Sequence, residues 1–432
     1  MTLTDNNFLL KLAATVAVFA AALLTFTLAN RGSHSAPETG GTVPVGNVST
    51  DVRIRDYQQL VSAHPKDSRG YDFLGDAYLQ KVRETGDASF YTRANAVYGR
   101  ALQLNPRDPA AVAGAGTLAL ARHDFRAGLQ YGLRARQLAP YSFQPLGVIV
   151  DAQVELGRYH DAGKSLQQMI DLRPNLSSYA RVSYWRELHG DLRGAIQAMQ
   201  AAVSAGGGVP ENVAYVQTLL GNLYFAVGRL DAAREAYRTA LESFPSYVQA
   251  VTGLANIDGA RQDLSSAIRR YRYVVGRLPL PQYVIALGEL QQAAGEKPDY
   301  GLVRAEERLF QANGVNTDVD LALFEASHGS PTRAVTLARR AWAQAPSVRS
   351  ADALGWALTS AGRPVVGLHW ARRALALGSR DPMFLYHAGK SAQAAGRAAL
   401  TRAYLSESLA LNPRFSPLYA PRAERALKEL GR

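Results

Sequence analysis

Two helices joined by a short turn can be read from the order of apolar and polar residues at positions 219–245, LLGNLYFAVGRLDAAREAYRTALESFP. Gly228 marks the turn, and the final proline ends the second helix. The small residues Gly221 and Ala233 would let the two helices approach closely, and the large Tyr237 would fill the space around that contact. This segment therefore predicts a helix-turn-helix unit.

The same unit recurs along the chain with a period of about 34 residues. One position of the first helix holds a small residue in every unit except the third. The intervals between successive occurrences of this position are 41, 34, 33, 38, 34, 33, 34, 33 and 34 residues. These positions are Gly75, Gly116, Val150, Ser183, Gly221, Ala255, Gly288, Ala322, Gly355 and Gly389. Dipeptides that end one helix and start the next are His123-Asp124, Gly157-Arg158, Gly190-Asp191, Gly329-Ser330, Gly362-Arg363 and Gly396-Arg397.

On these residues and this spacing, the chain resembles the tetratricopeptide repeat family. The resemblance implies an all-α, right-handed α-solenoid of about ten helix-turn-helix units with a C-terminal capping helix, in which each unit packs on its neighbours. An insertion around positions 84–91 lengthens the first unit. The pattern departs from the family at Val150, at Gly206–Gly208, where a unit ends without its proline, and at Lys297-Pro298. These departures affect local packing and leave the architecture unchanged.

The N-terminus carries an uncharged stretch, LAATVAVFAAALLTFTLA, at residues 12–29. As a helix it would span about 27 Å at about 1.5 Å per residue, close to a bilayer core of about 30 Å. A single transmembrane anchor is the favoured interpretation, because the stretch is longer than the apolar region of a signal peptide. The alternative is a cleavable signal that ends at Thr27-Leu28-Ala29. An uncleaved anchor would place the repeats outside the cytoplasm.

The expected organisation follows from these segments. It comprises an N-terminal flank at 1–11, the anchor or signal peptide at 12–29, a flexible Gly-, Ser-, Thr- and Pro-containing linker at 30–50, a half-repeat helix at 51–67, the repeat array at 68–415 and a C-terminal capping helix at 416–432. Arg accounts for 41 of the 48 basic residues, since there are seven Lys, and abundant Ala accompanies it. This composition favours a bacterial origin.

The first helices of tetratricopeptide units line a concave groove where partners bind, and the resemblance implies the same groove here. The residues expected to line it are Tyr184, Tyr215, Asn222, Phe225, Asn256, Trp356, Tyr386, Asp72, Asp76, Asp151, Glu155 and Glu187. Aromatic residues would supply contact area, although aromatics at helical spacing can equally be core. Asn222 and Asn256 occupy the same position in consecutive units, where related arrays hold a peptide backbone through paired amide hydrogen bonds.

Charge and composition narrow the function classes. The formal net charge is +12, but basic residues occur as scattered singles and pairs, which indicates solvated helix faces rather than a nucleic-acid surface. No cysteine is present, so cysteine-based metal, redox or nucleophilic sites are excluded. The eight histidines lack metal-ligand spacing, and no phosphate-binding loop or nucleophile elbow is found.

The sequence therefore predicts a non-enzymatic scaffold or adaptor of a bacterial cytoplasmic membrane, without a cofactor, that binds a segment of another protein in its groove. Two alternatives stay open. One is a regulatory or sensory subunit that responds to a small ligand, and the other is a secreted chaperone-like factor.

Overall fold

The computed structural model describes residues 49–207 and 209–431, and all regular secondary structure in these two stretches is helical. The all-α class predicted from the sequence is confirmed. The hydrophobic stretch at residues 12–29 lies outside the described residues, and so does nearly all of the linker.

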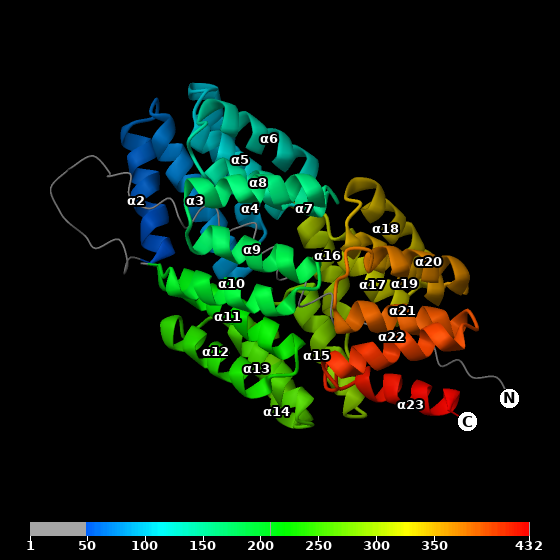
Figure 1. Cartoon of the computed structure of the whole chain (residues 1–432). Helices are drawn as coiled ribbons and strands as arrows, with labels where there is room; N and C mark the ends of the chain where they lie inside the picture. Colours follow the sequence, from blue (N-terminus) through cyan, green and yellow to red (C-terminus); the bar gives the residue numbers. More distant parts are fainter. Residues whose placement is uncertain (1–48, 208, 432) are drawn as a thin grey trace.

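Within the described residues, ten pairs of helices follow one another (Figure 1). The pairs are α3 (Ser68–Thr85) with α4 (Ser89–Leu104), α5 (Pro109–Ala121) with α6 (Phe125–Leu138), α7 (Gln144–Glu155) with α8 (Tyr159–Leu172), α9 (Leu176–Leu188) with α10 (Leu192–Ser204), α11 (Pro210–Ala226) with α12 (Leu230–Ser243), α13 (Val248–Ala260) with α14 (Leu264–Arg277), α15 (Pro281–Ala293) with α16 (Gly301–Ala312), α17 (Asp318–His328) with α18 (Pro331–Gln344), α19 (Val348–Ser360) with α20 (Pro364–Ala374), and α21 (Pro382–Ala394) with α22 (Ala398–Leu411). Helix α2 (Thr50–Ala63) precedes them and α23 (Ala420–Leu430) follows.

Short polar side chains and glycines set the ends of these helices. The Asp108 carboxylate accepts hydrogen bonds from the first backbone amides of α5, and Asn175 forms a reciprocal capping box with Ser178 at the start of α9. All six turn dipeptides singled out in the sequence lie between helices. Gly157 and Gly190 have φ of 70° and 77° in these turns, a backbone conformation that strains residues with a Cβ atom.

A buried tyrosine on the second helix of a pair explains why the first helices need small residues. The ring of Tyr237 lies so close to two helices that a Cβ atom would be 2.5 Å from it at Gly221 and 2.3 Å from it at Gly253. Gly221 belongs to the same pair as Tyr237, and Gly253 belongs to the next pair. One ring is thus sandwiched between two successive units, and the small residue predicted at Gly221 is confirmed as a packing requirement.

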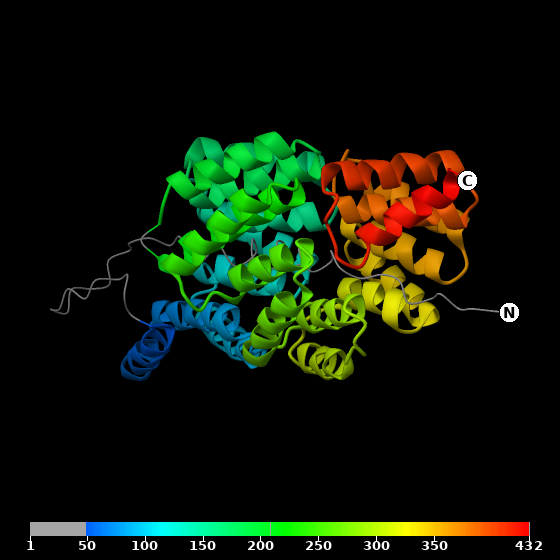
Figure 2. The ribbon, with the colours of Figure 1, turned by 90° about the horizontal axis from the view of Figure 1, so that it is seen from below.

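The array coils until its second half lies beside its first. Cyan and green helices occupy one side of Figure 1 and yellow to red helices the other, and the view from below shows the same two halves side by side (Figure 2). Three of the hydrogen bonds between the halves join residues that are 187 to 193 positions apart along the chain. With a repeat of about 34 residues, one superhelical turn takes between five and six units.

We call this contact the seam. It joins the turns at residues 122–126, 157–159, 190 and 225–228 in the first half to residues 313–316, 343–348, 378 and 411–412 in the second half. Across it, the Asn316 amide donates to the Arg122 carbonyl at 3.0 Å, the Val348 amide donates to the Tyr159 hydroxyl at 2.7 Å, and the Asn412 side chain donates to the Phe225 carbonyl at 2.7 Å.

Glycine is required where the backbones meet at the seam. A Cβ atom at Gly157 would lie 2.3 Å from the Pro346 carbonyl oxygen, and one at Gly190 would lie 2.2 Å from the Gly378 carbonyl oxygen. The apolar core also crosses the seam, because Val348 of α19 belongs to the same buried cluster as Tyr184 of α9. The two superhelical turns are therefore packed against each other rather than merely adjacent.

Candidate functional site

In three units a half-buried polar residue of the first helix accepts a hydrogen bond from a tyrosine of the second helix. The Tyr237 hydroxyl donates to the side-chain oxygen of Asn222 at 2.7 Å, and the Tyr271 hydroxyl donates to that of Asn256 at 2.8 Å. Both asparagines are half-buried. Each tyrosine holds its asparagine oxygen in place, so the amide nitrogen is left to donate elsewhere.

Asp76 occupies the equivalent place in the first unit. It accepts a hydrogen bond of 2.5 Å from the Tyr98 hydroxyl and is also half-buried. The tyrosine follows its partner by 22 residues here and by 15 residues in the other two units, and the insertion predicted in the first unit accounts for the difference. The arrangement is therefore a repeated feature, and an aspartate satisfies the tyrosine as well as an asparagine does.

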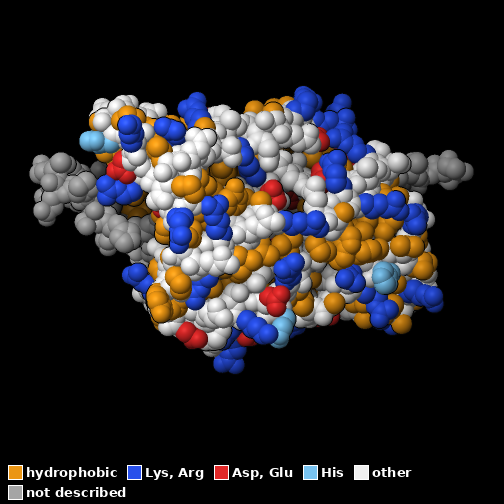
Figure 3. Space-filling view, turned by 90° about the horizontal axis from the view of Figure 1, so that it is seen from above, with side chains coloured by type: hydrophobic (Ala, Val, Ile, Leu, Met, Phe, Trp, Pro, Cys, Tyr) orange, Lys and Arg blue, Asp and Glu red, His pale blue; other side chains and the backbone are white. Residues whose placement is uncertain are grey.

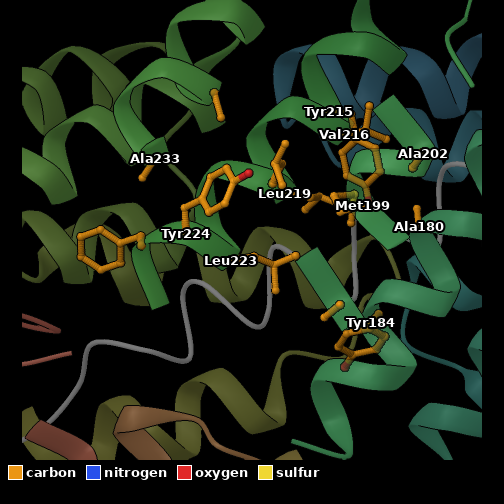
Figure 4. Packing of buried hydrophobic residues seen from close by; sticks show 14 of the residues in the cluster. Ala180, Tyr184, Met199, Ala202, Tyr215, Val216, Leu219, Leu223, Tyr224 and Ala233 are labelled. Carbon is orange, nitrogen blue, oxygen red and sulfur yellow. The ribbon is translucent and has the colours of Figure 1, made fainter. Parts of the chain in front are cut away.

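The five aromatic residues predicted to line the groove are packed in the core. Tyr184, Tyr215, Phe225, Trp356 and Tyr386 are at most 8% exposed. Both Tyr184 and Tyr215 belong to one buried apolar cluster, and Figure 4 shows them with other side chains of that cluster. A direct contact between these rings and a partner is not tested by this packing and stays a prediction.

The reason for this burial is visible at Trp356. Its indole nitrogen donates to the Ser327 hydroxyl of α17 at 3.2 Å, and its ring stacks on His387 of α21 at 4.8 Å. The first helices of neighbouring units thus pack side by side, and a residue between them is covered by both. Asn222 and Asn256 lie far enough around the helix to stay partly accessible.

Burial raises the pKa of three of the acidic residues predicted to line the groove. The Asp151 carboxylate is paired with buried Arg181 at 2.6 and 2.9 Å, yet burial outweighs this partner and raises its pKa to about 6. Burial, with a smaller contribution from Asp381, raises the pKa of Glu187 to about 8. The pKa of Glu155 is also raised by burial, and Arg349 at 3.9 Å opposes that shift. Asp72 is 3% exposed.

Of the five acidic residues singled out in the sequence, three are buried and two, Asp76 and Glu187, are half-buried. Arg349 lies between Glu155 of α7 and Asp320 of α17, at 3.9 Å from each, and links the two superhelical turns. Sequence reasoning placed Glu155 and Arg349 on the first helices but did not predict that they meet, because they are distant along the chain. Their role follows from the coiling of the array.

The outer surface carries dispersed positive charge. In the face shown in Figure 3, Lys and Arg side chains are spread among apolar and neutral atoms over both halves. Among residues 49–207 and 209–431, no group of His, Asp and Glu side chains has the geometry to hold a metal ion. Within the same part of the chain, no helix is both long enough and apolar enough to cross a membrane.

Comparison with known families supports the repeat. Residues 218–279 match the family model described as tetratricopeptide repeat. This stretch contains Asn222, Asn256 and both of their tyrosine partners. No curated protein matches the chain.

Several solved structures are similar to the chain. A thermophilic tetratricopeptide repeat protein from Thermus thermophilus, TTC0263, is 21% identical with a TM-score of 0.36, covering 48% of this chain and 99% of its own. The Cut9-Hcn1 hetero-tetramer of the APC/C gives 17% identity and a TM-score of 0.40, covering 87% of this chain and 81% of its own. Yeast Tom70 gives 12% identity and a TM-score of 0.32, covering 84% of this chain and 96% of its own.

Proposed function

We propose that the chain is a non-enzymatic protein-binding scaffold that holds an extended segment of a partner against the first helices of its repeats. The observation that carries this proposal is the repeated asparagine–tyrosine pair at Asn222 and Asn256. In each pair the side-chain oxygen is occupied by a tyrosine hydroxyl, which orients the amide nitrogen as a donor toward a peptide carbonyl. A scaffold is also the usual role of tetratricopeptide arrays.

The spacing of the two asparagines suits an extended partner. They stand at equivalent places in consecutive units, so one repeat of about 34 residues separates them along the chain. Donors fixed by neighbouring hydroxyls lose little conformational freedom on binding, and this favours recognition of a backbone over recognition of one particular side chain. The partner is then selected by its extended shape.

A substitution that preserves the fold can test this role. Asn222→Asp and Asn256→Asp keep the oxygen that accepts from each tyrosine and remove the amide donor, and Asp76 with Tyr98 is an example of such a pair in this chain. The matched control is Gln130→Glu with Gln137→Glu, which makes the same change in charge at exposed positions of α6.

The measurement is a crosslinking pull-down from membranes, with folding verified by circular dichroism. We expect one defined polypeptide to be recovered with wild type and with the control and to be reduced about tenfold or more with the double aspartate variant. Equal recovery with both variants would refute a role for the asparagine amides.

We further propose that residues 12–29 anchor this scaffold in a bacterial cytoplasmic membrane, with the repeats on the extracytoplasmic side. The uncharged character and the length of this stretch support an anchor. Carbonate extraction of membranes should leave the intact chain in the pellet and release a chain that lacks residues 2–29. Release of the intact chain, or a mature N-terminus at Asn30, would favour a secreted factor instead.

A further inference from the structure

A cavity of about 150 Å³ lies where the first superhelical turn meets the second. Its walls come from α3, the start of α4 and the end of α5 on one side, and from α16 and the N-terminal ends of α11, α13, α15 and α17 on the other. The blue helices of the first unit and the yellow-green helices around α16 are neighbours in Figure 2, and Ala88 shares a buried cluster with Phe310 and Val315. A cavity of about this volume can hold a benzene-sized molecule.

Aromatic rings dominate the wall of this cavity. Tyr91, Tyr215, Tyr247, Tyr283 and Phe310 all line it. Tyr283 is 2% exposed, and among the described residues its hydroxyl has no hydrogen-bond partner. Several tyrosine faces around a small volume are the arrangement that attracts an organic cation through cation–π interactions.

The charges at the wall leave one carboxylate poorly neutralised. Arg83 and Glu211 form an ion pair of 3.1 Å and offset each other. Asp320 also lines the cavity, and its nearest cation is Arg349 at 3.9 Å, which is beyond hydrogen-bond distance. Arg349 is at the same distance from Glu155, so one guanidinium serves two carboxylates. Burial accordingly raises the pKa of Asp320, and Arg349 opposes that shift, so a second cation would favour the ionised carboxylate.

His123 does not supply the missing charge. Its Nδ1 atom is hydrogen-bonded to the Asn316 carbonyl at 2.5 Å, and burial lowers the pKa of the imidazole. Asp320 opposes this shift, and His123 in turn lowers the pKa of Asp320, but burial favours the neutral imidazole. One Asp320 oxygen is buried and has no hydrogen-bond partner among the described residues, which is costly for a carboxylate unless a ligand supplies a donor.

We propose that this cavity binds a compact organic cation, an ammonium or guanidinium group on an apolar body, with the charge at Asp320 and the carbon atoms against the tyrosine rings. The group can belong to a free amine or to a Lys or Arg side chain of a partner. The site does not depend on the asparagine pairs of the scaffold function. Because the cavity is built from both superhelical turns, its occupant stabilises the closed seam by mass action.

Calorimetric titration of the full chain with benzylamine tests this proposal, with benzyl alcohol as the neutral probe of the same shape. We expect benzylamine to bind at least about tenfold more tightly than benzyl alcohol, and Asp320→Asn to weaken benzylamine by about 10- to 100-fold. The matched control is Asp161→Asn, an exposed aspartate on α8, which should leave binding unchanged.

A second variant keeps the test independent of the folding of Asp320→Asn. Gln282 lines the cavity and is half-buried, so Gln282→Trp should fill the cavity and abolish benzylamine binding without changing the circular dichroism spectrum. Equal affinity for benzyl alcohol, binding that survives both variants, or no benzylamine binding at all would overturn the proposal.

Two further titrations identify the source of the cation. A blocked tripeptide, acetyl-Ala-Lys-Ala-amide, represents a partner side chain, whereas benzylamine represents a free amine. Tighter binding of the tripeptide assigns the cavity to a partner, and tighter binding of benzylamine assigns it to a small ligand. If the asparagine variants still recover the partner, the scaffold proposal fails, whereas benzylamine binding is unaffected. The two proposals therefore fail separately.

Discussion

The seam makes glycine substitutions in equivalent turns unequal. Gly157, Gly190, Gly362 and Gly396 all occupy the turn between the two helices of a unit, with φ of 70°, 77°, 74° and 70°. Alanine at any of them costs about 1–2 kcal/mol for the left-handed backbone. A Cβ atom meets nothing within 4 Å at Gly362 or Gly396, so the backbone cost is the whole effect there.

At Gly157 and Gly190 the backbone on the other side of the seam must also move. The Cβ atom would lie 2.3 and 2.2 Å from a carbonyl oxygen, whereas a carbon and an oxygen in contact are about 3.3 Å apart. A shift of about 1 Å would lengthen the nearby bond from the Val348 amide to the Tyr159 hydroxyl, now 2.7 Å, beyond hydrogen-bond range. Losing one or two such bonds adds about 1–3 kcal/mol.

Hydrogen exchange measures this difference directly. The amides of Asn316 and Val348 donate across the seam, so Gly157→Ala with Gly190→Ala should accelerate their exchange and increase the radius of gyration measured by small-angle scattering. Gly362→Ala with Gly396→Ala should destabilise the last units and leave those two amides protected. Equal protection of both amides in the two double variants would refute the packed seam.

Three further predictions follow from buried groups. Gly253→Ala should destabilise the protein by about 1–3 kcal/mol in urea denaturation, because it overpacks the Tyr237 ring. In the same assay, Gly276→Ala should stabilise the protein by about 0.5–1 kcal/mol, since Gly276 is an open, exposed position of α14. Arg181→Met should cost about 3–5 kcal/mol in the same assay, since it leaves the Asp151 carboxylate buried without its partner. Burial raises the folded-state pKa of Glu187 to about 8, so the folded chain retains a proton that the unfolded chain releases, and stability should fall as pH rises from about 4.5 to about 8. Glu187→Gln should reduce that slope in urea titrations at pH 5 and 9, with Asp151 and Glu155 supplying the remainder, and an unchanged slope would disprove the assignment.

Local structure could be predicted from the sequence because its causes are local. Gly221 with Tyr237, and the turn dipeptides, each lie within one repeat of about 34 residues, and the period repeats the same constraints along the chain. The places of Asn222 and Asn256 could also be predicted, since both follow from the helical period. Their tyrosine partners could have been found, because the interval of 15 residues recurs in both units.

The burial of the aromatic residues could not be predicted in the same way. Whether a ring such as Trp356 faces a groove or a neighbouring helix depends on the angle between successive units, and a rotation of one residue, about 100° on a helix, exchanges the two outcomes. The sequence contains no residue that fixes this angle alone. Side-by-side packing of the first helices decides it, and Ser327 and His387, which contact the indole, lie 29 and 31 positions away.

The seam shows why the cavity was also beyond sequence reasoning. Gly157 and Gly362 have the same role in their own units and nearly the same φ, yet only Gly157 meets another backbone. The difference arises because each unit is slightly rotated relative to the one before it, and these rotations accumulate over five or six units. It is therefore a property of the whole array and not of any single repeat. Asp320 thus lines one cavity with Tyr91 and Tyr215, which belong to units remote from it in the chain. A site formed between superhelical turns can therefore be lost by changing a turn glycine that touches no ligand, and Gly157→Ala should weaken benzylamine binding although Gly157 does not line the cavity.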